Sequence, residues 1–243
     1  MKILRTSFLL FTFLFSFNTF AQDCLTCAND INILREYLEK TPSFKDQVQK
    51  KSFHEKVDLM MKTMPDTVSE LDCFVLLSEL LYEIRDNHLF LSQIAALELT
   101  NDYLEDPALA DKYYESTEGK NFPTSTMNLD SLATALSGFS ESEVPGIYHY
   151  KDYLKIGLFQ TQKTDSLVAV VLESKLLTWK PGEIAFYLQD RGNDKFWAIH
   201  YHLVKKTLGF YKNEQWIGGN FTMVGWRKNL DKADFSQPTP ETQ

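Results

Sequence analysis

The sequence predicts an α+β protein in which an N-terminal three-helix bundle is followed by an antiparallel β meander that curls into a small barrel or sandwich. Apolar residues recur at helical spacing over residues 30–91. From residue 146 onward, apolar and polar residues alternate with the two-residue period of strands. Turn-forming residues separate the apolar runs of this second half at short intervals, which is typical of a meander.

Residues 1–21 have the organisation of a cleavable signal peptide. Lys2 and Arg5 precede an apolar run over residues 8–17. This run is shorter than the roughly 20 residues that a membrane-spanning helix needs, which disfavours the alternative of an uncleaved membrane anchor. We therefore expect cleavage after Ala21, a mature chain without a membrane anchor, and export to the periplasm or the medium.

Three cysteines follow the predicted cleavage site: Cys24, Cys27 and Cys73. Export makes a disulfide chemically plausible. We expect Cys73 to pair with Cys27 or Cys24, which would tie the start of the mature chain to a later helix and stabilise it by about 4 kcal/mol. The alternative of a redox pair formed by Cys24 and Cys27 lacks the preceding strand of a thioredoxin-like site.

Three helices are expected in the first part of the mature chain. Asp30 can cap the first helix, and Pro42 ends it. A second helical stretch begins near Phe44 and stops before Pro65. Ser69 opens a third helix with a capping box, and the wide apolar face of this helix predicts a central place in the bundle.

The helical domain is expected to span residues 22–142, with an irregular connector over residues 92–142. Residues 118–126 contain glycine and proline and predict an exposed loop. Residues 129–136 predict one short helix.

Residues 143–229 predict the antiparallel β-domain, and the proline-containing residues 230–243 predict a disordered tail. The expected strands contain the following alternating or continuous apolar runs: 154–158, 167–172, 184–188, 197–203, 208–210 and 216–226.

The charge balance excludes two classes of partner. The net charge of -8 becomes -10 when Lys2 and Arg5 are removed with the signal peptide. An acidic chain without a basic cluster does not suit nucleic acid or an anionic membrane surface. No complete set of metal ligands and no cofactor motif is recognisable, so neither a metal nor a cofactor is expected. The oligomeric state stays open.

Four residues of the β-domain are candidates for ligand binding: Trp197, His200, His202 and Trp216. The two histidines lie two residues apart on a strand, so their side chains leave the same face. Because Trp197 belongs to the opposite, apolar face, we expect the histidines to point to solvent, or into the barrel if it is hollow. Trp197 and Trp216 would either line a ligand cavity or fill the core.

Several short stretches resemble the tail-specific, C-terminal-processing serine peptidase family, in the form found in exported Bacteroidetes-type proteins. Three of them resemble the N-terminal helical region of that family: 23–27 with its two cysteines, 71–81, and 85–88, where Asn87 stands in place of the family's glycine. Four others resemble the β-region that precedes the peptidase core: 145–148, 153–157, 171–174 and 179–182.

The family's catalysis uses a serine nucleophile and a lysine base in a downstream core, and no residue of this chain matches that core. No catalytic residue is therefore assigned. The resemblance implies a non-catalytic relative or truncated member that binds an extended peptide or another exported protein. The alternatives are a small-ligand carrier with a β-barrel site and a peptidase whose catalytic half is absent from this chain. A filled barrel with a groove between domains would favour the first hypothesis, and a hollow barrel lined by Trp197 and His200 would favour the carrier.

Overall fold

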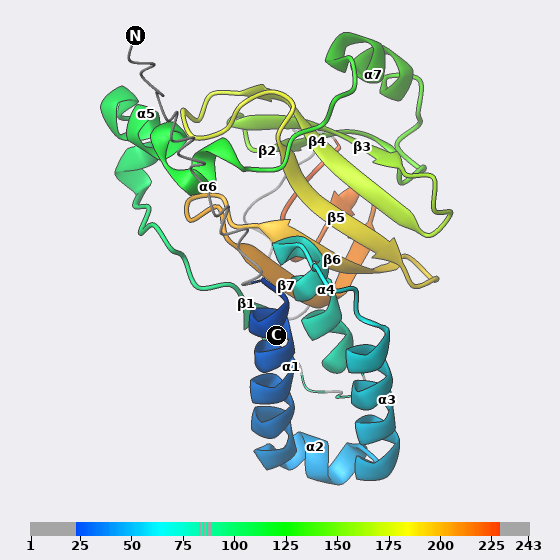
Figure 1. Cartoon of the computed structure of the whole chain (residues 1–243). Helices are drawn as coiled ribbons and strands as arrows, with labels where there is room; N and C mark the ends of the chain where they lie inside the picture. Colours follow the sequence, from blue (N-terminus) through cyan, green and yellow to red (C-terminus); the bar gives the residue numbers. More distant parts are fainter. Residues whose placement is uncertain (1–22, 83, 85, 87–88, 229–243) are drawn as a thin grey trace, which may run out of the picture.

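The structure, a computed structural model, describes residues 23–82, 84, 86 and 89–228 (Figure 1). The predicted signal peptide and disordered tail lie outside the described residues. The α+β class is confirmed, because a curled antiparallel sheet follows a group of N-terminal helices. The described part of the chain has seven α-helices, whereas the sequence predicted three in the bundle and one more over residues 129–136, which the structure confirms as a helix.

Four of these helices form a bundle that projects from one side of the sheet (Figure 1). They are α1 (Asp23–Lys40), α2 (Pro42–Gln47), α3 (Lys50–Thr63) and α4 (Glu70–Leu80). The expected start of the first helix at Asp30 was wrong, because α1 already begins at Asp23. Pro42 ends α1 as expected but also opens α2, where the missing N–H of proline costs nothing and Thr41 supplies the cap.

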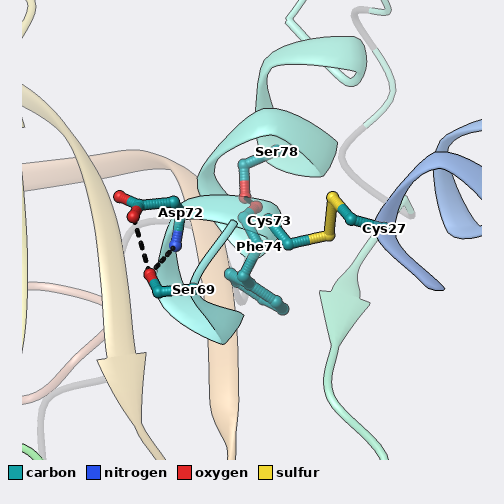
Figure 2. The surroundings of a disulfide bond; sticks show 6 residues. All are labelled: Cys27, Ser69, Asp72, Cys73, Phe74 and Ser78. Carbon is teal, nitrogen blue, oxygen red and sulfur yellow. Dashed lines mark hydrogen bonds between the residues drawn. A yellow bond between two sulfur atoms is a disulfide. The ribbon is translucent and has the colours of Figure 1, made fainter. Parts of the chain in front are cut away.

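A disulfide bond between Cys27 and Cys73 joins α1 to α4 (Figure 2). This bond decides the pairing that the sequence left open, and it closes a loop with a sequence separation of 46 residues. Ser69 caps α4 next to it by accepting a hydrogen bond from the backbone N–H of Asp72. The start of α4 is therefore fixed twice, by a covalent bond and by a cap.

The connector is more ordered than expected. It contains a two-residue strand and four short helical segments: β1 (Leu91–Ser92), η1 (Asn101–Leu104), α5 (Pro107–Glu115), α6 (Thr117–Lys120) and α7 (Leu129–Leu136). Residues 118–126 lie at the surface as expected, but they are not a free loop, since residues 118–120 belong to α6. Pro123 accepts a hydrogen bond from the N–H of Ile184, and Thr124 pairs with Glu183, so this segment is attached to the sheet.

The sheet is an antiparallel meander with the order β1-β7-β6-β5-β4-β3-β2, and β8 pairs with β7. Its main strands are β2 (Gly146–Tyr150), β3 (Leu154–Gln160), β4 (Ser166–Ser174), β5 (Ile184–Asp190), β6 (Lys195–Tyr201), β7 (Leu208–Ile217) and β8 (Asn220–Phe221). The sheet curls into a half-barrel, and Arg227 bridges its open side by pairing with both His149 of β2 and Asn220 of β8.

Apolar side chains cover both faces of the sheet. The inner face is filled by a core that includes Phe186, Phe196, Phe221 and Trp226. On the outer face, α7 packs against β3 and β4, and α4 packs against β6 and β7. Because both faces are buried, most strand residues are apolar, and the alternation in the sequence does not tell the inner face from the outer one.

Lys212 fastens the bundle to the sheet. Its ammonium group lies at the C-terminal end of α4 and donates hydrogen bonds to the carbonyl oxygens of Leu81, Tyr82 and Ile84. A cation at this end of a helix also interacts favourably with the helix dipole. The position of α4 relative to β6 and β7 is therefore held by charge as well as by apolar packing.

Candidate functional site

A groove of about 630 Å³ lies between α4 and the outer face of the sheet. Leu71, Val75 and Ser78 form its helical wall, since residues at these spacings share one face of a helix. Tyr187 and Trp197, from the neighbouring strands β5 and β6, form the opposite wall. The groove thus combines an aliphatic wall with an aromatic one.

The charged residues along the two edges of the groove differ in sign. Asp72 and Glu79 lie on α4, whereas Lys163 lies in the turn between β3 and β4 on the other side. Burial raises the pKa of Tyr187, and the negative charge of Asp72, which lines the helical side of the groove, raises it further. The helical border is therefore acidic.

Arg191 and Tyr82 hold the indole of Trp197. The guanidinium of Arg191 lies 4.0 Å from the centroid of the Trp197 ring, and Tyr82 packs edge-on against the same ring with centroids 4.9 Å apart. A cation over an aromatic face and an edge-to-face ring pair are both favourable. These two contacts hold the Trp197 ring in one orientation.

A second cluster surrounds a buried ion pair at the other end of β6. The ammonium nitrogen of Lys206 lies 2.6 Å from a carboxylate oxygen of Glu183, and the two side chains are 2% and 3% exposed. Lys206 also donates to the carbonyl oxygen of Thr178 at 2.7 Å, and its nitrogen lies 3.8 Å from the ring centroids of both Phe122 and Trp179. This one ammonium group therefore joins the 202–207 turn, the β4–β5 connection and the connector.

Burial lowers the pKa of Lys206 to about 8, although the charge and hydrogen bond of Glu183 act in the opposite direction. The Glu183 carboxylate also accepts hydrogen bonds from the N–H of Lys180 and the hydroxyl of Tyr114. Buried ionisable groups with shifted pKa values occur at functional sites and in structural ion pairs alike. Here the full set of partners indicates a structural role for the pair itself.

The four residues predicted to bind a ligand do not come together. Trp197 lines the groove on the outer face. Trp216 packs against the inner core, and its indole N–H donates to the hydroxyl of Tyr148 at 2.9 Å. His202 lies in the turn after β6, where Nδ1 accepts hydrogen bonds from the N–H groups of Val204 and Lys205.

His200 does not point to solvent as expected. It stacks on Tyr211 with centroids 4.7 Å apart, and its Nε2 is buried without a hydrogen-bond partner among the described residues. Burial lowers the pKa of His200 to about 4, so its imidazole is neutral at pH 7. The expectation failed because Trp197 faces the helices, which leaves His200 on the inner side of the curled sheet.

In the segment 85–88, which resembles the Asp-Gly-His motif of the peptidase family, the structure describes only Asp86. Arg85, Asn87 and His88 lie outside the described residues, whereas Asp86 accepts a hydrogen bond from the hydroxyl of Ser43.

Within the residues that the structure describes, no group of three or more potential ligands could hold a metal ion. Over the same residues, no helix has the length and apolar character needed to cross a membrane.

The chain matches no family model, no curated protein and no solved structure. The groove and the buried ion pair were not predicted from the sequence. Both depend on contacts between residues far apart in the chain, and only the apolar character of Trp197 and of the helix containing Leu71 pointed towards the groove.

Proposed function

We propose that the protein is a non-catalytic binding module that holds a segment of another polypeptide in the groove between α4 and the outer face of the sheet. The observation that carries this proposal is the aromatic wall formed by Tyr187 and Trp197 opposite Leu71 and Val75. The volume of about 630 Å³ lies in the range of ligand sites. Aromatic residues at such positions contribute most of the binding energy in many interfaces.

The filled interior of the sheet favours this proposal over a small-ligand carrier. Phe186, Phe196 and Phe221 occupy the space in which a carrier would hold its ligand, and each is at most 2% exposed. The groove, by contrast, is open at the surface and lies where the two halves of the chain meet.

The charges around the groove indicate the chemistry of the partner segment. Asp72 and Glu79 are seven residues apart on α4, which places them about 10 Å apart along the helix axis at 1.5 Å per residue. A complementary segment carries apolar side chains between two basic residues at a similar distance. The net charge of -8 adds a long-range attraction for such a segment.

Peptide binding to the mature chain tests this function. Three fluorescent peptide libraries share randomised apolar central positions and differ only in their flanking residues, which are lysine, glutamate or serine. Fluorescence anisotropy should show the strongest binding for the lysine set. Val75→Lys, which places a long charged side chain across the groove, should abolish this binding.

Glu79→Lys tests the charge complementarity without removing an apolar contact. It should weaken binding of the lysine set about tenfold and shift the preference towards the glutamate set, since like charges at an interface are unfavourable. Asp66→Lys makes the same charge change at an exposed residue outside the groove and should leave binding unchanged. Equal binding by the Val75→Lys variant and the unmodified protein would refute the groove as the site.

We also propose, from the sequence resemblance, that the chain is an exported relative of the tail-specific peptidase family and that its partner is an exported peptide or protein. The Cys27–Cys73 bond supports a place in an oxidising compartment, because disulfides persist mainly there. Labelling of the purified protein by a serine-reactive activity probe would contradict the non-catalytic role.

A further inference from the structure

Strand β1 forms one edge of the sheet, where it pairs with β7 alone. The N–H of Gln93 points towards β7, since it donates to the carbonyl oxygen of Leu208 at 2.8 Å. Because successive residues of a strand direct their backbone groups to opposite sides, Phe90, Ser92 and Ile94 direct theirs away from β7. Among the described residues, no backbone partner lies on that side of β1.

The opposite edge of the meander is protected, and the edge at β1 is not. At the far edge, His149 of β2 exchanges backbone hydrogen bonds of 2.7 and 2.9 Å with Arg227. Natural sheets guard an open edge with charged residues, proline or a covering segment, because an unguarded edge pairs with another strand. Residues 89–97, which include β1, contain neither a charged residue nor a proline. The sequence of β1 is therefore that of a strand with neighbours on both sides.

Two large apolar side chains stand on this open edge. Ile94 is 92% exposed and Phe90 is 55% exposed. Each lies two residues from Ser92, so the three side chains share one face of the sheet. Antiparallel pairing of this edge with a copy of itself, about a two-fold axis at Ser92, sets Phe90 opposite Ile94 of the copy. An aromatic residue opposite a β-branched one is a favourable cross-strand pair.

Helix α1 extends the same side of the molecule (Figure 1). Leu34 of α1 shares an apolar cluster with Leu91 of β1, so the helix packs beside the edge strand. Ile33 and Tyr37, which are one helical turn apart on α1, are both exposed. A two-fold axis perpendicular to the joined sheet places the α1 helices of the two copies on the same face of it, where these residues can add to the contact.

The charges favour a second copy of this chain over the basic partner proposed for the groove. The uncharged segment 89–97 offers no counter-charge to a basic peptide, whereas two identical uncharged edges bring no like charges together. We propose that the protein forms a two-fold dimer in which the β1 strands of two copies pair antiparallel and join the two sheets into one. Since both copies use the same patch, the assembly ends at two chains.

Sedimentation velocity of the mature chain tests the dimer. At concentrations up to about 0.1 mM it should show a dimer that dissociates on dilution. Ile94→Lys places a charge on the paired edge and should weaken dimerisation at least about tenfold. Leu59→Lys makes the same kind of change at an exposed residue of α3 and should leave dimerisation unchanged. A monomer throughout this range, open-ended aggregates, or equal dimerisation of Ile94→Lys and the unmodified chain would each overturn the proposal.

Cross-linking through Ser92→Cys tests the register of the pair. The Cys24→Ser background removes the cysteine that the disulfide between α1 and α4 does not use. In the dimer the introduced thiols face each other across the axis, and Cα atoms about 5.5 Å apart allow a disulfide. Mild oxidation should give a covalent dimer by mass spectrometry, whereas Leu59→Cys in the same background should give none. No covalent dimer from Ser92→Cys, or equal cross-linking of both variants, would overturn the proposal.

Discussion

Replacement of Lys206 by methionine tests the buried ion pair that joins three segments of the chain. The Lys206→Met variant keeps a long apolar stem among Phe122 and Trp179 but leaves the carboxylate of Glu183 buried without its cation. Removal of one partner from a buried pair destabilises proteins by about 3–5 kcal/mol. Glu183 retains hydrogen bonds from Lys180 and Tyr114, so we expect about 3–4 kcal/mol.

Urea unfolding at pH 7, followed by circular dichroism, measures this change as a lower midpoint with an unchanged slope. The double variant Lys206→Met, Glu183→Met should recover most of the loss, because no unpaired charge stays buried. Lys175→Met is the matched control, since the pair of Lys175 with Asp152 is 68% and 66% exposed and its loss should leave the midpoint nearly unchanged. The reasoning is refuted if Lys206→Met costs no more than Lys175→Met, or if the double variant is as unstable as the single one.

Three further perturbations test other parts of the fold. The pKa of Lys206 is about 8 in the folded protein, whereas its ordinary value is 10.5. Between these two pH values the unfolded state binds more protons than the folded state, so the free energy of unfolding should rise with pH. Urea titrations over this window should show the rise in the unmodified protein and not in Lys206→Met. Cys73→Ser should lower the free energy of unfolding by about 4 kcal/mol in the chain-entropy model. Dithiothreitol should have the same effect on the unmodified protein and none on this variant. Lys212→Met removes the ammonium group that donates hydrogen bonds to the carbonyl oxygens after α4. This should lower the free energy of unfolding by about 2 kcal/mol, as expected for the loss of charged hydrogen bonds. Hydrogen exchange should become faster in the last turn of α4 and stay unchanged in α1.

The strands of the β-domain were predictable because their signal is local. The alternation around residues 154–158 and 184–188, with turn residues between the runs, gives β3 and β5 without any knowledge of their neighbours. Likewise, Ser69 caps α4 where the capping box predicted a helix start. The sequence did not predict the ordered connector, whose segment around Pro123 and Thr124 is attached to the sheet through hydrogen bonds with residues about 60 positions later.

The two faces of β6 show why the candidate site could not be predicted. The alternation places Trp197 on the apolar face of its strand, which predicts a residue of the main core. In the structure Trp197 packs against the helical bundle, and Phe196 and Ala198 belong to the main core instead. Alternation in a strand that is covered on both sides does not say which face is which, so His200 was assigned to solvent. Lys206 gave no local signal at all, since a lysine in a polar turn is usually exposed and its burial depends on Phe122, Trp179 and Glu183.

Hydrogen exchange of the mature protein, with and without the tightest peptide from the lysine-flanked library, tests the central claim most directly. If the groove between α4 and the outer face of the sheet is the binding site, the peptide should slow exchange in Glu70–Leu80 and in Lys195–Tyr201 while α1 stays unchanged. Slower exchange confined to other segments, or an identical pattern with and without bound peptide, would contradict the account.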